Sequence, residues 1–243
     1  MMEIDILLLE SLNQFARNAP VTDVLISFIT HSNLFKGAVM MGFFWFGWFM
    51  SQPDQEQKRK ALLSTLFAAV ATLITARALA LTLPHRLRPM HDSSVDMELP
   101  VGMAPQLAGW SSFPSDHAAL FGCLASGMFL VSRRMGWLAT AYCLLAIMLP
   151  RVYSGLHYPS DLLAGFMMGA AYTWIFSRNV VVTGAVQPVY DWCVRRPALF
   201  YALLFLISYS IATLFNDLRN LGDLVMIIID RFFQNDSSIK ALN

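Results

Sequence analysis

Residues 113–117 read FPSDH and residues 151–161 read RVYSGLHYPSD, and each stretch stands beside a long apolar run. Holding unpaired arginine, histidine or aspartate side chains at the edge of hydrocarbon carries a large desolvation cost. Polar residues at such positions therefore indicate a site more often than simple packing. These two stretches are the first candidates for chemistry in the chain.

The composition around them indicates a polytopic helical membrane protein. Hydrophobic residues make up 56% of the 243 residues and charged residues only 14%, and the mean hydropathy is +0.53. Several apolar runs approach the roughly twenty residues that cross a bilayer as a helix. The net charge of +1, without a long basic tract, argues against a nucleic-acid partner. Three scattered cysteines form neither a disulfide framework nor a set of metal ligands.

The apolar runs predict an all-α bundle of about six transmembrane helices, at residues 34–50, 61–83, 113–132, 137–150, 160–177 and 198–215. Before them, apolar residues at helical spacing between Ile4 and Phe15 predict a helix that lies in the membrane interface. The tail at 216–243 mixes apolar and charged residues, which predicts a second surface helix or one that faces a partner. No repeat or linker divides the chain, so we expect one domain over residues 1–243.

The distribution of lysine and arginine predicts how the bundle is oriented. One side collects Lys58, Arg59, Lys60, Arg133, Arg134, Arg178, Arg195 and Arg196, whereas the other holds Arg86, Arg88 and Arg151. The richer side is expected to be cytoplasmic. The loops at 85–112 and 151–159 then share the opposite, extracytoplasmic face, which predicts one composite site.

The residue types in these loops suit a phosphate ligand. Arg86, Arg88 and Arg151 offer guanidinium groups that bind phosphate through two parallel hydrogen bonds. Pro114 and Pro159 suit the first turn of a helix, so Ser115 and its neighbours are expected at helix N-termini, where backbone N–H groups also favour anions.

His157 and Asp161 stand four residues apart, and two arrangements would bring them together. Either the helix already includes position 157 and both lie on one face, or the carboxylate reaches back across a helix cap. A histidine held by a carboxylate can attack phosphorus. His117 can then protonate the leaving oxygen. Two histidines with separate partners divide the work without a metal ion.

Three blocks in this order and spacing resemble the type 2 phosphatidic acid phosphatase superfamily. The blocks are Arg88-Pro89, then the stretch 114–117 (PSDH), then Arg151 followed by His157 and Asp161 at the family's spacing. The resemblance covers about residues 60–175, which is the expected catalytic core. The PSDH variant and the leading interfacial helix are most similar to the bacitracin-resistance type of undecaprenyl pyrophosphate phosphatase.

The resemblance implies a role for each motif residue. His157 would be the nucleophile that becomes phosphorylated, Asp161 would orient it, and His117 would be the general acid. Arg88, Arg151 and Ser115 would hold the phosphate oxygens, and neither a metal nor another cofactor is expected.

The chain departs from the family pattern at three positions. Leu81 replaces the lysine of the first block, and Arg86 is the expected substitute for it. Pro150 replaces a serine, and Asp116 replaces a glycine and adds negative charge beside the site. Arg77, inside the second predicted span, is expected to pair internally or to extend towards the interface.

The predicted function is a metal-independent membrane phosphatase that converts undecaprenyl pyrophosphate into its monophosphate at the outer face of a bacterial inner membrane. Phosphatidic acid or phosphatidylglycerophosphate is the alternative substrate. Three rival classes also fit parts of the sequence: a serine hydrolase that uses Ser115, a metal-dependent hydrolase, and a non-enzymatic lipid transporter that retains an anion site. The sequence assigns no oligomeric state.

Overall fold

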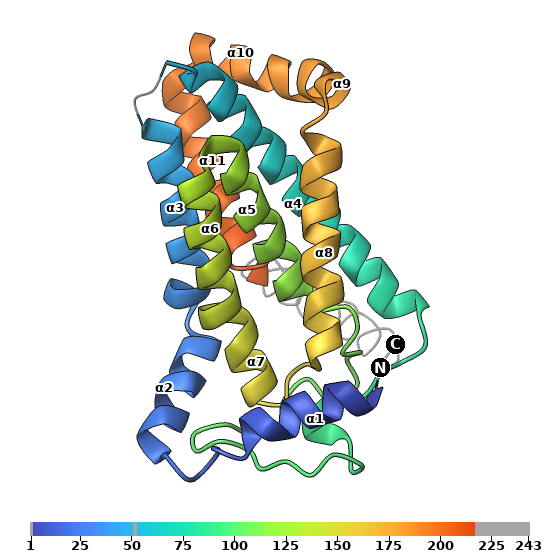
Figure 1. Ribbon diagram of the computed structural model, residues 1–243. Coiled ribbons are helices and arrows are strands. Elements are labelled where there is room, and N and C mark those ends of the chain that lie inside the picture. Colours follow the sequence, from blue (N-terminus) through green and yellow to red (C-terminus); the bar gives the residue numbers. More distant parts are fainter. Residues whose placement is uncertain (1, 51–52, 217–243) are drawn as a thin grey trace, which may run out of the picture.

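The described part of the chain, residues 2–50 and 53–216, consists of helices and the loops that join them and contains no β-strand in the computed structural model (Figure 1). The longer helices are α1 (Met2–Asn13), α2 (Pro20–His31), α3 (Val39–Phe49), α4 (Gln55–Thr82), α5 (Asp116–Val131), α6 (Arg133–Tyr142), α8 (Pro159–Phe176), α10 (Gln187–Arg195) and α11 (Pro197–Ala212). Shorter elements are η1 (Leu34–Ala38), η2 (Pro89–His91), η3 (Cys143–Met148), α7 (Leu149–Tyr153), α9 (Asn179–Val181) and η4 (Val182–Val186). The all-α prediction is confirmed for these residues.

Helix α5 forms the centre of the bundle, between α4, α6 and α8 (Figure 1). Most of its side chains are buried. Helix α8 approaches it through small residues: a Cβ on Gly165 would lie 2.5 Å from the carbonyl oxygen of Ser115, and one on Gly169 would lie 2.2 Å from that of Ala119. Small residues allow helix backbones to approach closely in a membrane bundle. This contact brings the beginnings of α5 and α8 together.

The predicted count of six spans is not confirmed. Helices occupy all six predicted ranges, but among the described residues only α4 and the continuous stretch Arg133–Tyr153 are long and apolar enough to cross a membrane alone. A third candidate is the pair Pro20–His31 and Leu34–Phe49, which bends by 69°. Helices α5 and α11 are apolar but shorter. In α5 the reason is local, because residues 113–115 precede the helix and Ser115 caps it.

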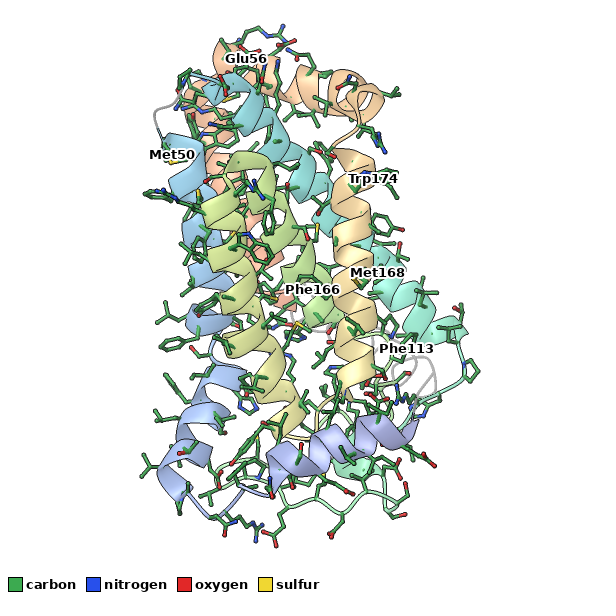
Figure 2. The ribbon with its side chains drawn as sticks, viewed as in Figure 1. Met50, Glu56, Phe113, Phe166, Met168 and Trp174 are labelled. Carbon is green, nitrogen blue, oxygen red and sulfur yellow. The ribbon has the colours of Figure 1, made fainter. Side chains whose placement is uncertain are left out.

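The two ends of the bundle differ. At one end, α1 crosses beneath α7 and α8 next to the long loop that follows α4, and at the other end α9 and α10 run across the bundle (Figure 1). Figure 2 shows the same separation, with Phe113 near the first end and Glu56 at the second. The predicted tail helix falls within residues 217–243, which lie outside the described residues.

Candidate active site

A cavity of about 290 Å³ opens at the end of the bundle where α4 ends and α5 begins. Four of the seven predicted site residues line it, namely His117, His157, Arg88 and Arg151. The two sequence stretches and the arginine block therefore meet in one cavity. Ser115, Asp161 and Arg86 are not among its lining residues, and each takes a different position described below.

The ring of His157 is held with one nitrogen free for chemistry. Its Nδ1 lies 2.9 Å from the carbonyl oxygen of Ser112, which can only accept, so Nδ1 carries the hydrogen. Nε2 then has a lone pair, and Arg88, which can only donate, contacts it at 3.1 Å. Burial of the imidazole lowers the pKa of His157 from its usual value, although the nearby Asp161 opposes the shift. The neutral ring with Nε2 exposed to the cavity is the form that can attack phosphorus.

Asp161 reaches His157 across a helix cap, so the second of the two predicted arrangements is correct. His157 precedes α8, whereas Asp161 lies in the first turn of the helix and accepts from the backbone N–H of Tyr158 at 2.9 Å. Its carboxylate is 3.8 Å from Nδ1 of His157, which is too long for a hydrogen bond. The Ser112 hydroxyl donates to the same carboxylate. Ser112 therefore contacts both groups, through its carbonyl and through its hydroxyl.

Arg86 has a different set of partners from the expected phosphate. Its guanidinium donates to Asp161 at 2.6 Å and to Asp5 of α1 at 2.9 Å, and it lies 4.2 Å from the centre of the Tyr158 ring. Asp5 also accepts from the backbone N–H of Ser160 at 2.8 Å. The predicted role of Arg86 in holding phosphate stays a prediction, and the geometry favours a role in fixing Asp161.

His117 is held by its sequence neighbour Asp116. The carboxylate of Asp116 lies 2.8 Å from Nδ1 of His117, and it also accepts from Arg77 at 2.6 Å. Arg77 thus pairs internally, which is one of the two behaviours expected for it. A carboxylate beside Nδ1 stabilises the imidazolium form, which is the state a general acid needs.

Ser115 caps α5. Its side chain accepts from the backbone N–H of Ala118 at 3.4 Å, and its own N–H donates to the carbonyl oxygen of Asp161 at 3.2 Å. The residue is fully buried. Its predicted contact with phosphate stays a prediction; its observed role is to join the beginnings of α5 and α8.

Arg88 and Arg151 bring two buried cations to the cavity. Arg88 donates to the carbonyl oxygen of Leu156 at 2.7 Å, and its Nε has no hydrogen-bond partner among residues 2–50 and 53–216. Arg151 donates to the carbonyl oxygen of Ile147 at 2.7 Å. Neither forms an ion pair with a carboxylate within the described residues. Burial lowers the pKa of the Arg88 guanidinium from its usual value, and a bound anion would offset this desolvation.

Sequence reasoning missed Ser112, the contacts of Asp116 and the presence of Lys36 in the lining of the cavity. Asp116 was visible as a carboxylate next to His117, but its negative charge was expected to oppose the binding of phosphate. Lys36 was visible as a cation inside an apolar run, which is itself a signal of function. Ser112 gave no signal, because its carbonyl contact depends on the path of a loop. Over residues 2–50 and 53–216, no group of three or more histidine, cysteine, aspartate or glutamate residues is placed to hold a metal ion.

Residues 60–183 match the PAP2 superfamily. The chain belongs to this superfamily. The resemblance drawn from the three sequence blocks is thereby confirmed, and relatives bearing the expected names are among those found.

Three curated relatives align with parts of the chain. They are the bacitracin transport permease protein BcrC of Bacillus licheniformis, 41% identical over 59 residues (24% of this chain and 29% of the relative), and the lipid A 4'-phosphatase of Bacteroides thetaiotaomicron, 36% identical over 93 residues (37% and 41%). The third is the undecaprenyl-diphosphatase of Sulfolobus acidocaldarius, 30% identical over 80 residues (32% and 37%). Each alignment spans less than half of the relative.

One solved structure of similar shape is the crystal structure of Aquifex aeolicus LpxE. It is 21% identical in sequence, with a TM-score of 0.48, and the alignment covers 70% of this chain and 92% of that one.

Proposed function

We propose that this PAP2 superfamily member is a lipid phosphatase that hydrolyses the terminal phosphate of a lipid phosphate or diphosphate through a phosphohistidine at His157. The observation that carries the proposal is the convergence of His157 and His117 with Arg88 and Arg151 in one cavity. Transfer of a phosphoryl group needs held imidazoles and cations that are free to bind the phosphate, and in the described part of the chain neither arginine pairs with a carboxylate.

In the first step Nε2 of His157 attacks the terminal phosphorus, and the bond from phosphorus to the ester or bridging oxygen breaks. The protonated His117 gives its Nε2 proton to that oxygen, and Asp116 stabilises the imidazolium beforehand. As Nε2 of His157 bonds to phosphorus, Arg88 moves its hydrogen bond from that nitrogen to a phosphate oxygen. The ring becomes cationic, and the carbonyl of Ser112 together with the carboxylate of Asp161 stabilises it.

In the second step a water molecule attacks the phosphohistidine. His117, now neutral, takes a proton from that water, the bond between phosphorus and Nε2 breaks, and inorganic phosphate leaves. His157 returns to its neutral form and His117 to its protonated form, so the cycle is complete. Arg88 and Arg151 offset the charge of the three phosphate oxygens in both steps.

An apolar cleft beside the cavity supports a lipid as the substrate. The cleft, about 330 Å³, shares Arg77 and Asp116 with the cavity and is otherwise lined by Val70, Leu73, Ile74, Leu214 and Phe215. A second apolar cleft of about 420 Å³ shares Val70 and Ile74 with the first. A headgroup in the cavity would thus have an apolar path along α4 for its tail.

The favoured substrate is undecaprenyl diphosphate, with undecaprenyl monophosphate as the product. The name of one relative refers to bacitracin, and the name of another is undecaprenyl-diphosphatase. The third relative is named for lipid A, so phosphorylated lipid A is a second candidate, beside phosphatidic acid and phosphatidylglycerophosphate. The proposed location is a bacterial inner membrane, with the cavity on the outer face.

The experiment that tests this function measures phosphate release from a panel of these lipids by the purified protein, with a chelator present. The expected result is release from a lipid diphosphate or monophosphate that persists with the chelator and is absent in His157→Ala. Acid-labile phosphate on His157 after a rapid quench would identify the intermediate. Binding without release in the whole panel would instead indicate a transporter, and activity lost with the chelator would indicate a metal-dependent hydrolase.

A further inference from the structure

Lys36 is a buried cation that the proposed mechanism does not use. It lies in η1, at the 69° bend between α2 and α3, and its side chain is only 8% exposed. It lines the same cavity as His117 and Arg151. Its ammonium group has no hydrogen bond or ion pair within the described part of the chain. The side chain is mostly buried and lines the cavity, where an anionic ligand would offset the cost of desolvating its ammonium group.

The backbone around Lys36 is held firmly on both sides. Tyr142, the last residue of α6, donates its hydroxyl to the carbonyl oxygen of Phe35 at 2.5 Å. On the other side, a Cβ on Gly37 would lie 2.2 Å from the carbonyl oxygen of Ala212 in α11, so the bend can pack there only because residue 37 is glycine. The position of Lys36 is therefore set by contacts with two neighbouring helices.

Lys36 also lies outside residues 60–183, the part that matches the superfamily. The lysine of the family's first block is replaced here by Leu81, which is 79% exposed and is not among the residues that line the cavity. The cavity therefore receives its only lysine, within the described residues, from a different helix.

Lys36 lines the same cavity as His117, which protonates the leaving group in the proposed reaction. Its ammonium interacts electrostatically with Arg151 and Asp116, and His117 in turn experiences the charge of Lys36. The charged groups that act on His157 are instead Arg88, Asp161 and Asp116. In the proposed reaction His117 protonates the oxygen that stays with the lipid. In a diphosphate, that oxygen belongs to the second phosphate group.

We propose that Lys36 binds the lipid-linked phosphate of a diphosphate substrate and so favours diphosphates over monophosphates. The inference rests on the proposed phosphatase activity. Terminal phosphate would lie against His157, Arg88 and Arg151, and the second phosphate would lie against Lys36 beside His117. The ammonium would also stabilise the charge that the departing monophosphate gains as the bridging bond breaks.

The test compares Lys36→Met and Lys36→Arg with the parent protein on farnesyl diphosphate and farnesyl monophosphate in the same detergent. These substrates share one tail and differ by one phosphate group. Methionine keeps the length of the side chain without its charge, and arginine keeps the charge. Lys58→Met, at the far end of the bundle, is the matched control.

The expected result is a fall of about 10- to 100-fold in kcat/KM for the diphosphate in Lys36→Met. For the monophosphate the fall should be about threefold or less, and arginine should restore most of the preference. The ratio between the substrates is the decisive readout, because general damage to the fold would lower both activities together. If Lys36→Met does not accumulate in the membrane, the ratio of kcat/KM between the two substrates is measured for Lys36→Gln instead.

An unchanged ratio, or an equal loss on both substrates, would overturn the role of Lys36 while the phosphatase function stands. If the parent protein releases phosphate from neither substrate nor from any other lipid phosphate, the proposed function fails first. Inhibition gives a second measure: inorganic pyrophosphate should lose inhibitory strength relative to inorganic phosphate in Lys36→Met, and parallel losses would contradict the proposal.

Discussion

The carboxylate of Asp161 lies 3.8 Å from Nδ1 of His157, and Ser112 contacts both of them. The carboxylate therefore acts on the imidazole at short range but without a direct hydrogen bond. The proton on Nδ1 is held by a backbone carbonyl, which no side-chain substitution can remove. This arrangement makes the roles of Ser112 and Asp161 separable by mutation.

We expect Ser112→Ala to lower kcat modestly and Asp161→Asn to lower it severely. The serine variant loses a hydroxyl worth about 1 kcal/mol, roughly fivefold in rate, while the carbonyl still holds His157. The asparagine variant loses the charge that stabilises the imidazolium, which predicts a fall of roughly 10³-fold. Steady-state phosphate release measures both. Equal losses would mean that the hydroxyl, rather than the carboxylate charge, holds the ring.

His157→Ala and His117→Ala should each abolish phosphate release while the protein still inserts in the membrane. Loss of a nucleophile or its acid–base partner lowers rates by roughly 10⁴-fold or more. The two variants should differ in one respect: His117→Ala retains the nucleophile and can still form some phosphohistidine with a good leaving group. Near-normal turnover by either variant would refute the role assigned to that residue. His85→Gln, in an exposed loop, is the control.

Arg88→Ala and Arg151→Ala should lower kcat/KM by about 10²- to 10³-fold, because the cations act on charge that develops in the transition state. Lysine at position 88 should restore little, since the guanidinium contacts Leu156 and His157 together. The measurement is kcat/KM on one lipid substrate for each variant. If kcat/KM is unchanged, the arginine concerned does not contact the transferring phosphate.

Arg86 and Asp5 should behave as one structural unit. We expect Asp5→Asn to lower Tm by about 3–6 °C and Arg86→Met to lower it at least as much, because Arg86→Met also breaks the ion pair with Asp161. The double variant should add little to Arg86→Met, since the pair between Arg86 and Asp5 is already lost there. Phosphate release and Tm are measured on all three variants. If Arg86 instead holds phosphate, Arg86→Met will raise KM strongly and Asp5→Asn, which is not among the residues that line the cavity, will not.

The acidic limb of the kcat/KM profile should lie below pH 6.5. Burial lowers the pKa of His157 from the histidine value of 6.5, so the ring stays neutral and nucleophilic until the pH falls through that lowered pKa. The same shift affects stability: the neutral ring is favoured in the fold, so stability is lost as pH falls below the pKa of the unfolded chain.

The measurement is kcat/KM against pH for a lipid diphosphate and a lipid monophosphate. Phosphate esters themselves titrate near pH 6, so the limb common to both substrates is the one assigned to the enzyme. A common limb at or above pH 6.5 would contradict a neutral, buried His157.

The sequence predicted the chemistry of the site better than its contacts. The motif spacing correctly brought His117, His157, Arg88 and Arg151 together, because reactive groups of these types have few other reasons to cluster beside apolar runs. The sequence offered a helix cap as one of two ways to bring Asp161 to His157, but it did not reveal the intervening Ser112, because a backbone carbonyl has no signature in the sequence.

The details that the sequence did not resolve have a common physical cause, which is that the partner of a side chain depends on helix ends and packing. Arg86 was matched to phosphate by charge, but Asp5 and Asp161 lie within its reach. The negative charge of Asp116 was expected to oppose phosphate binding, but Arg77 and His117 both contact its carboxylate. The span count was set by hydropathy, whereas α5 begins only after the cap at Ser115.

Helix α1 gives the carboxylate of Asp161 a dependence that motif comparison would overlook. Asp5 of this helix forms an ion pair with Arg86, and Arg86 forms a second ion pair with Asp161. A fragment trimmed to residues 60–183 would keep every hallmark residue of the superfamily and still lose this counter-ion. Chimeras that exchange catalytic segments between relatives should therefore carry the first helix along with them.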